Sequence, residues 1–212
     1  IVVEVPQALR PYARPLSLLY LIVVLRTLTA LSYSTFVPVM LTRRGMSLAE
    51  AGMAAATYLV AVGAGGFVGG PLADRWGARR VIILSLVLCV PFLAVAPILP
   101  GWTLVAVLSI GGFLLQSTLP VNVTFGQMIA PISAATVSSL MMGFAWGTGG
   151  LAVPLVGMVA DRIGIERTLV TMSVVPLVAA ALALPLPAGK HAYGARASAV
   201  ATPVATGTDV AE

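Results

Sequence analysis

The sequence predicts an all-α integral membrane protein with six transmembrane helices. Hydrophobic residues make up 59% of the 212 residues and charged residues only 9%, whereas ordinary soluble domains are about 25% charged. The mean hydropathy is +1.03. Six apolar runs reach the roughly 20 residues that a helix needs to cross a hydrocarbon core of about 30 Å. Because these runs are long and continuous, they favour helices over the short alternating strands of a membrane barrel.

Short breaks rich in glycine, proline and charged residues separate the six apolar runs. In chain order they contain Arg43-Arg44-Gly45, Asp74-Arg75-Trp76-Gly77, Pro100-Gly101, Pro131 and Asp161-Arg162-Ile163-Gly164. These residue types punctuate regular structure and keep charge out of the hydrocarbon. The transmembrane helices are therefore predicted at residues 16–42, 49–73, 80–99, 102–130, 133–160 and 168–187.

The chain divides into three segments. Residues 1–15, which contain three prolines, are predicted to form a cytoplasmic connecting segment before the six-helix bundle of residues 16–187. Residues 188–212 are rich in Ala, Thr and Gly, so we expect a disordered cytoplasmic tail. The chain begins at Ile1 rather than at a methionine. We therefore expect it to be part of a longer protein, with a half-transporter that pairs with a second copy as the alternative.

The basic residues predict the orientation, because cytoplasmic loops carry an excess of Lys and Arg. With both ends in the cytoplasm, the inside would carry Arg10, Arg14, Arg75, Arg79, Arg80, Lys190 and Arg196. The outside would then carry Arg43, Arg44, Arg162 and Arg167. Seven against four favours cytoplasmic ends.

One short pattern, G-x-x-A-D-R-x-G, occurs twice in the chain. The first copy comprises Gly70, Asp74, Arg75 and Gly77 with the residues between them, and the second comprises Gly157, Asp161, Arg162 and Gly164. The copies are 87 residues and three predicted spans apart. An odd number of crossings places them on opposite faces of the membrane. The spacing thus predicts a three-plus-three inverted repeat, a plan that many transporters share.

The first copy and its neighbours resemble the signature loop of the major facilitator superfamily, which joins the second and third helices of each six-helix half. The matching residues are Gly70-Pro-Leu-Ala-Asp74-Arg75-Trp76-Gly77-Ala-Arg79-Arg80. Three stretches further resemble the second half of the fosmidomycin-resistance group of drug exporters: Val62–Arg80, Leu119–Pro131 and Met142–Arg162. The resemblance implies that residues 16–187 form the C-terminal half of a major facilitator fold.

The residues of this loop suit a conformational switch. Gly70 and Gly77 permit close backbone approach and a sharp turn at the membrane surface. Asp74 is placed to accept hydrogen bonds at a helix N-terminus. The arginines are placed to bind that carboxylate or lipid phosphates, and they are Arg75, Arg79 and Arg80. The competing interpretation is a loop whose arginines only fix the orientation.

Arg26 lies midway along the first predicted span, where an arginine costs about 2.5–3.5 kcal/mol on insertion scales. Thr29 and Tyr33 follow at i+3 and i+7, so the three residues share one helical face. Gln116 and Asn122 add amide side chains on the fourth span. We predict that these five residues line a substrate path. The alternatives for Arg26 are snorkelling to the interface or pairing with an acid of another six-helix half.

Composition excludes most catalytic chemistry. The chain has one cysteine, Cys89, and one histidine, His191, so a disulfide framework or a zinc site is not expected. No nucleophile–base pair stands out, so we do not predict an enzyme, a metal or a cofactor. The formal charge of +5 is explained by loop arginines, and nucleic acid is not expected as a partner.

Together these patterns predict a secondary active transporter of the bacterial inner membrane. The resemblance implies drug or metabolite efflux, driven by protons through alternating access. The expected partners are a small-molecule substrate, the lipid bilayer, and an N-terminal six-helix half or a second copy. An importer of a sugar or organic anion, and a non-transporting scaffold or sensor subunit, remain the alternatives.

Overall fold

The computed structural model of the chain describes residues 13–130 and 134–187, and all regular elements in these residues are helices. Six of them, some assembled from shorter pieces, are long and apolar enough to cross a membrane. The predicted all-α class with six transmembrane helices is therefore confirmed. The predictions for residues 1–12 and 188–212 lie outside the described residues.

The first three spans are nearly unbroken helices. They are α2 (Ala13–Arg43), α3 (Leu48–Trp76) and α4 (Ala78–Val95), which η2 (Ala96–Ile98) extends. The first span begins three residues before the predicted residue 16, so Ala13 to Pro15 belong to the helix rather than to the connecting segment. Ser47 caps α3 by accepting a hydrogen bond from the backbone N–H of Glu50, whose carboxylate accepts from the Ser47 N–H at 2.8 Å.

The last three spans are assembled from shorter helices. The fourth consists of α5 (Gly101–Gln116) and α6 (Thr118–Ile129), and the sixth of α10 (Ile165–Met172) and α11 (Val175–Ala183). The fifth consists of α7 (Ala134–Ser139), η4 (Leu140–Phe144), α8 (Ala145–Leu151) and α9 (Val153–Ile163). All twelve predicted boundaries fall within four residues of these spans.

Each break in the last three spans lies shortly before a proline, although Pro38, Pro71 and Pro91 lie inside the unbroken helices α2, α3 and α4. A proline lacks the N–H of a helical hydrogen bond and clashes with the preceding turn. The breaks at Ser117, Ala152 and Ser173 each lie two or three residues before Pro120, Pro154 or Pro176. The fifth span also contains the π-helical turn η4. The last three spans are thus interrupted helices, whereas the first three are nearly continuous.

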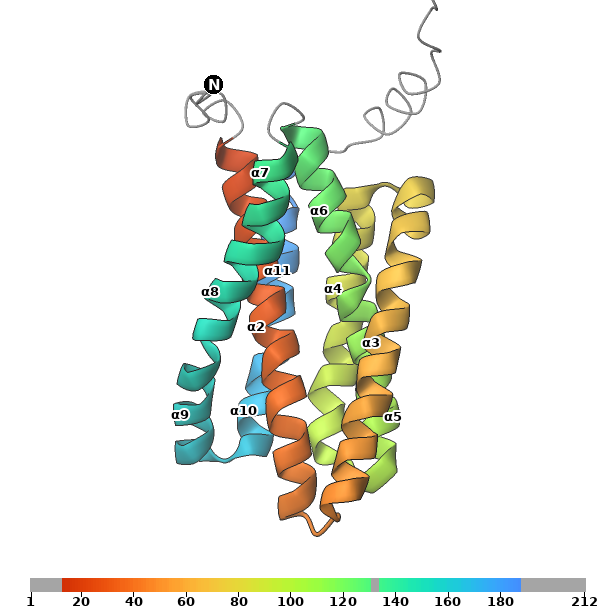
Figure 1. Cartoon of the computed structure of the whole chain (residues 1–212), viewed down its shortest axis with the longest axis vertical. Coiled ribbons are helices and arrows are strands. Elements are labelled where there is room, and N and C mark those ends of the chain that lie inside the picture. Colours follow the sequence, from red (N-terminus) through yellow and green to blue (C-terminus); the bar gives the residue numbers. More distant parts are fainter. Residues whose placement is uncertain (1–12, 131–133, 188–212) are drawn as a thin grey trace, which may run out of the picture.

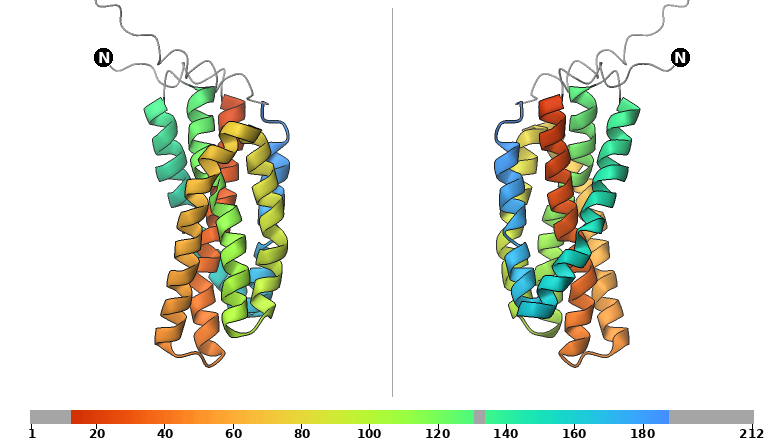
Figure 2. Two further views of the ribbon diagram at one scale, coloured as in Figure 1. Left: turned by 90° about the vertical axis from the view of Figure 1, so that its right-hand side faces the viewer. Right: turned by 90° about the vertical axis from the view of Figure 1, so that its left-hand side faces the viewer.

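The spans run up and down the bundle, with α2 flanked by α3 on one side and α8 on the other (Figure 1). The turn between α3 and α4 lies at the end of the bundle where α2 begins, and the turn between α9 and α10 lies at the opposite end (Figures 1 and 2). We call the latter the distal end. The two copies of the repeated pattern therefore lie at opposite ends, as the inverted repeat predicts.

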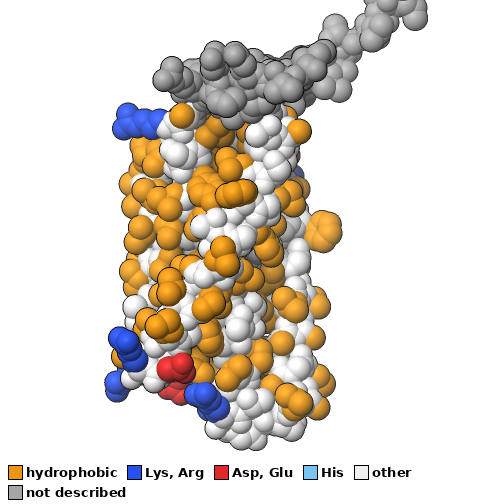
Figure 3. All heavy atoms as spheres, turned by 60° about the vertical axis from the view of Figure 1, so that its left-hand side comes forward, with side chains coloured by type: hydrophobic (Ala, Val, Ile, Leu, Met, Phe, Trp, Pro, Cys, Tyr) orange, Lys and Arg blue, Asp and Glu red, His pale blue; other side chains and the backbone are white. Residues whose placement is uncertain are grey.

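The surface of the bundle suits a bilayer. On the face in Figure 3, hydrophobic side chains cover the middle of the bundle, and the charged side chains lie toward its two ends. Large apolar side chains are exposed on the surface of the bundle; for example, the exposed fraction is 85% for Phe67 and 82% for Leu151. A soluble monomer does not expose so much contiguous apolar surface, whereas lipid tails solvate it.

Two glycines bring α3 into backbone contact with α5. A Cβ atom added to Gly65 would lie 2.2 Å from the carbonyl oxygen of Phe113, and one added to Gly69 would lie 1.8 Å from that of Ser117. No real Cβ approaches a backbone atom so closely. Because lipid tails are as apolar as leucine, helices in a membrane associate largely through such close packing. The small residues of α3 therefore fix the helix pair.

Gly69→Ala is expected to destabilise the bundle, because the methyl group must push α3 away from the α5 backbone. The cost is about 1–3 kcal/mol, as for overpacking elsewhere, which lowers the Tm of the detergent-purified protein by several degrees. Gly52→Ala is the matched control on the same helix, since nothing lies within 4 Å of its added Cβ. Equal Tm values for the two variants would contradict the backbone contact.

Candidate functional site

Arg26 lies in the middle of α2 and is completely buried, with 0% of its surface exposed. One terminal nitrogen, Nη2, donates a hydrogen bond to Oε1 of Gln116 at the end of α5. The other two nitrogens, Nε and Nη1, are buried without a hydrogen-bond partner. The side chain does not snorkel to the interface, which removes one of the alternatives for this residue.

A cavity of about 80 Å³ lies beside the guanidinium. Its lining comes from α2, α3, α5 and α8, and comprises Arg26, Thr27, Ala30, Leu31, Ser34, Tyr58, Leu59, Val62, Gln116 and Trp146. The hydroxyl oxygen of Thr27 is also buried without a partner. Buried polar atoms in native proteins are nearly always satisfied, so each exception calls for a missing partner. Three such atoms belong to two neighbouring residues of the cavity lining, and they indicate that a polar partner is missing in this region.

The charge of Arg26 is not balanced inside the bundle. Among the described residues the acids are Glu50, Asp74, Asp161 and Glu166, and all four lie near the ends of spans. An unpaired charge buried in a medium of low dielectric constant costs several kcal/mol. The charge must therefore be balanced by a ligand, by water or by an acid from outside the described residues.

The guanidinium beside this cavity has donors that suit an anion, although about 80 Å³ is below the roughly 300–1,000 Å³ of small-molecule sites, so a substrate would also need space outside these six helices. A guanidinium presents several N–H donors in a planar fork, which matches the oxygens of a carboxylate or phosphate. With Nη2 committed to Gln116, Nε and Nη1 remain as donors. Tyr58 and Trp146 add aromatic surface to the lining. The site thus combines one cation with an apolar wall, as ligand sites commonly do.

The structure brings together only two of the five residues predicted for the substrate path, Arg26 and Gln116. Thr29 donates to the carbonyl of Leu25 within α2, and Asn122 is buried without a hydrogen-bond partner for its amide, away from the cavity lining. The hydroxyl of Tyr33 lies 2.8 Å from the carbonyl oxygen of Leu93 and 2.7 Å from that of Leu169. It therefore ties α2 to α4 and α10, and its place in a substrate path stays a prediction.

Tyr58 and Trp146 line the cavity but were not singled out from the sequence. Tyr58 belongs to the buried stripe of α3, which otherwise consists of Ala51, Ala54, Gly65, Gly69 and Ala73. Helical periodicity places Tyr58 on a stripe of small residues, and a single large side chain with a hydroxyl on such a stripe could have been singled out from the sequence. Trp146 carries no comparable signal, because it lies on a helix with little burial.

The predicted switch loop takes the sharp turn expected of its glycine. Gly77 has φ 89° and ψ 139°, a conformation that L residues with a side chain rarely adopt. Asp74 and Arg75 are exposed, and the described residues contain no ion pair between Asp74 and the neighbouring arginines. Arg79 instead donates to the backbone carbonyl of Leu184 at the end of α11. A cation at a helix C-terminus is favoured by the helix dipole.

The second copy of the pattern repeats this turn at the distal end. Gly164 has φ 90° and ψ 150°, nearly the values of Gly77. Asp161 and Arg162 are exposed, like Asp74 and Arg75. Gly157 is half-buried, and a Cβ added to it would meet the ring of Phe36 at an ordinary 3.5 Å. The two copies are therefore equivalent in backbone structure as well as in sequence.

These features define a class of protein: an integral membrane bundle with an inverted repeat and a polar site at its centre, the plan of secondary transporters. The sequence profile of the Major Facilitator Superfamily matches residues 19–206. The chain belongs to the Major Facilitator Superfamily, and the resemblance of its signature loop is confirmed. Members of this family are transporters rather than enzymes. The described residues contain no group of His, Cys, Asp and Glu that could hold a metal ion.

Two relatives within the superfamily are similar to this chain in sequence. The chain is 34% identical over 161 residues to the fosmidomycin resistance protein of Escherichia coli (strain K12), a match that covers 76% of the chain and 39% of that protein. It is 34% identical over 113 residues to the uncharacterized MFS-type transporter YfnC of Bacillus subtilis (strain 168), covering 53% of the chain and 28% of that protein. The matches thus span less than half the length of either relative.

The pairing of Arg26 with Gln116 predicts an unusual pattern of stability. Arg26→Leu removes a poorly compensated buried charge, so the Tm of the purified protein should stay the same or rise. Gln116→Leu removes the acceptor of Nη2 and should cost about 1–3 kcal/mol, or several degrees of Tm. In the double variant the loss should disappear, because no cation is left unpaired. A large loss of Tm for Arg26→Leu alone would mean that the arginine is a structural residue.

Proposed function

We propose that this chain is one six-helix half of a secondary active transporter that exports an anionic small molecule by alternating access, driven by protons. The observation that carries the proposal is the buried guanidinium of Arg26, which has two nitrogens without a hydrogen-bond partner and belongs to the lining of a cavity at mid-bundle. Ionisable residues inside a membrane are costly and usually mark the path of a substrate or ion. An anionic substrate would supply the missing charge, and Gln116 would hold the guanidinium in place when the site is empty.

A second six-helix bundle is part of the proposal. Of the six spans, α3 and the fifth span, α7 to α9, have the smallest buried share, 22% and 17% of their apolar windows. Both carry glycines with open space around an added Cβ, namely Gly63, Gly66, Gly70, Gly143 and Gly147. Such glycines allow another helix to approach at backbone distance. These two spans flank α2, so a bundle packed on them would enclose the cavity of Arg26. The second bundle is an N-terminal half or a second copy of this chain.

We place the protein in the bacterial inner membrane with both ends of the chain in the cytoplasm. The bacterial relatives and the excess of Lys and Arg that the sequence predicts for the cytoplasmic side, seven against four, support this placement. In this orientation the signature loop faces the cytoplasm. Its exposed charges are free to form and break contacts with the second bundle as the halves rock.

The direction of transport rests on the relative from Escherichia coli, whose name states resistance to fosmidomycin. Fosmidomycin is a phosphonate, and its negative charge suits a guanidinium. Export of such a compound would confer resistance, uptake would increase sensitivity, and a scaffold or sensor subunit would change neither. An exporter, an importer and a scaffold or sensor subunit therefore differ in whether expression raises, lowers or leaves unchanged the inhibitory concentration of the drug.

Expression of the full-length protein in a bacterium without its own fosmidomycin exporter is expected to raise the inhibitory concentration of the drug. Arg26→Gln should abolish the increase and reduce transport into inverted vesicles by about 10- to 100-fold, as expected when a charged hydrogen bond is lost. The matched control is Arg162→Gln, which removes an exposed arginine outside the cavity lining.

Transport by Arg26→Gln at the wild-type rate would remove Arg26 from the substrate path. A lower inhibitory concentration on expression would indicate an importer. Dissipation of the proton gradient separates the coupling from the binding, because it should stop wild-type export without changing the affinity for the drug.

A further inference from the structure

A second cavity, of about 320 Å³, lies at the distal end of the bundle, far along α2 from Arg26. It is lined by the end of α2, the turn after α9 and the start of α10, through Met40, Arg43, Arg44, Ile163, Gly164, Ile165, Glu166 and Arg167. Its volume is at the lower end of the range for small-molecule sites, about 300–1,000 Å³. Three arginines and one acid give the lining a net charge of +2.

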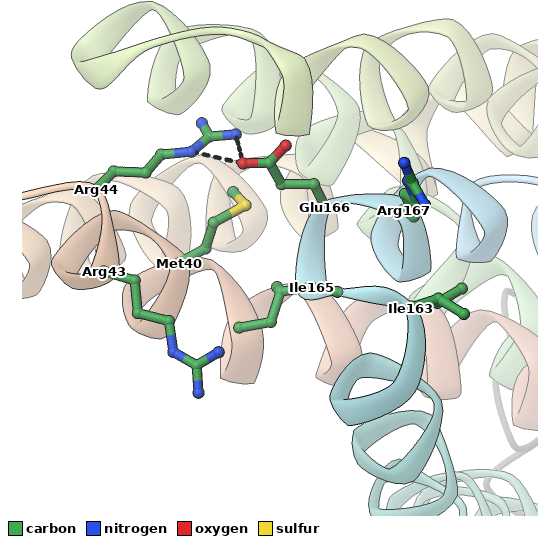
Figure 4. A pocket seen from close by; sticks show the side chains of 8 residues that line it. Met40, Arg43, Arg44, Ile163, Ile165, Glu166 and Arg167 are labelled. Carbon is green, nitrogen blue, oxygen red and sulfur yellow. Dashed lines mark hydrogen bonds and ion pairs between the residues drawn. The ribbon is translucent and has the colours of Figure 1, made fainter.

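Arg44 links the segments that form this distal cavity. Its Nη2 lies 2.6 Å from Oε1 of Glu166, and its Nε donates to the same oxygen at 3.0 Å (Figure 4). The third nitrogen, Nη1, donates to the carbonyl oxygen of Leu99 at 2.8 Å. Arg44 therefore joins three turns of the distal end, and it neutralises the only acid of the cavity lining.

The other two arginines, Arg43 and Arg167, take no part in this network. They lie on either side of the ion pair in Figure 4, one from α2 and one from α10. Within residues 13–130 and 134–187, neither side chain has an ion-pair or hydrogen-bond partner. Two cations beside a cavity whose own acid is already paired attract an anion.

The start of α10 strengthens the attraction. The first N–H groups of a helix have no partner within it and carry the positive end of the helix dipole. In α10 no side chain caps them, and the residues of this first turn, Ile165, Glu166 and Arg167, belong to the cavity lining. The cavity also has an apolar part, formed by Met40, Ile163 and Ile165. Its ligand should therefore carry both a negative charge and an apolar group.

We propose that the distal cavity binds the phosphate group of an amphipathic organophosphate through the positive charge that Arg43 and Arg167 bring to its two sides, with the apolar part of the ligand against Ile163 and Ile165. The position at the end of the apolar belt, where lipid headgroups lie, suits the phosphate of a phospholipid; a soluble phosphate ester has the same chemistry. The site is separate from the central cavity of Arg26. It anchors a ligand at the edge of the bundle and does not depend on transport.

The proposal is tested with full-length protein in an uncharged detergent by calorimetric titration with dihexanoyl-phosphatidylglycerol. Arg43→Gln/Arg167→Gln should weaken binding by at least about tenfold, because each cation near a lipid phosphate contributes about fivefold. Arg162→Gln is the control for charge at the same end, since Arg162 does not line the cavity. Arg43→Lys/Arg167→Lys should retain most of the affinity. Arg26→Leu should bind as the wild type does, which separates this site from the proposed transport.

Glycerol 3-phosphate identifies the source of the ligand. If it displaces the lipid at similar concentrations, the site takes soluble phosphate esters; if it does not, the lipid itself is the ligand. Either result supports an anion site at the distal end. Equal affinity for dihexanoylglycerol, which has the same acyl chains but no phosphate, or an equal loss of affinity in Arg162→Gln, would overturn the proposal.

Discussion

The central constraint on this protein is the burial of one guanidinium among bilayer-length helices. Arg26 is fully buried, and Gln116 is its hydrogen-bond acceptor among the described residues. An amide oxygen carries no net charge, so it orients the arginine without balancing it. An anion that binds beside this guanidinium would stabilise it, whereas a buried guanidinium without a counter-charge costs free energy. The six helices thus hold a cation whose partner must come from outside them.

The inverted repeat places similar restraints at the two ends of the bundle. At one end Arg79 donates to the carbonyl of Leu184, and at the distal end Arg44 donates to the carbonyl of Pro97. The two acceptors are 87 residues apart, the same offset as the two copies of the repeated pattern. Arg79 therefore caps the last turn of the sixth span, and Arg44 caps the last turn of the third span at the distal end. The two donors, Arg44 and Arg79, are not related by that offset, so only the acceptors follow the repeat.

Much of the fold follows from the sequence because a bilayer leaves little choice. Backbone groups in hydrocarbon must be satisfied within the helix, so the length of an apolar run predicts a span, and the twelve predicted boundaries agree closely with the structure. The repeated pattern predicts the inverted arrangement because an odd number of spans separates its copies. The burial of Arg26 was also predictable, since the residue lies at the middle of a span.

Contacts between spans could not be predicted in the same way, because they depend on how the helices are rotated. Arg26 and Gln116 were both assigned to a polar path, but the hydrogen bond between them requires α2 and α5 to face each other at that depth. Tyr33 shares a helical face with Arg26, yet its hydroxyl reaches α4 and α10. The sequence likewise groups Asp74 with Arg79, whereas Arg79 caps α11. Helical periodicity identifies a face and does not identify the neighbour that covers it.

The most direct test of the account is whether water reaches position 26 during the transport cycle. The measurement is labelling of Arg26→Cys in full-length protein by a membrane-impermeant thiol reagent, with the native Cys89, which is fully buried, as the internal reference. Cys at position 26 is expected to react far faster than Cys89 and to be protected by an anionic substrate. A reaction as slow as that of Cys89, with or without substrate, would contradict it.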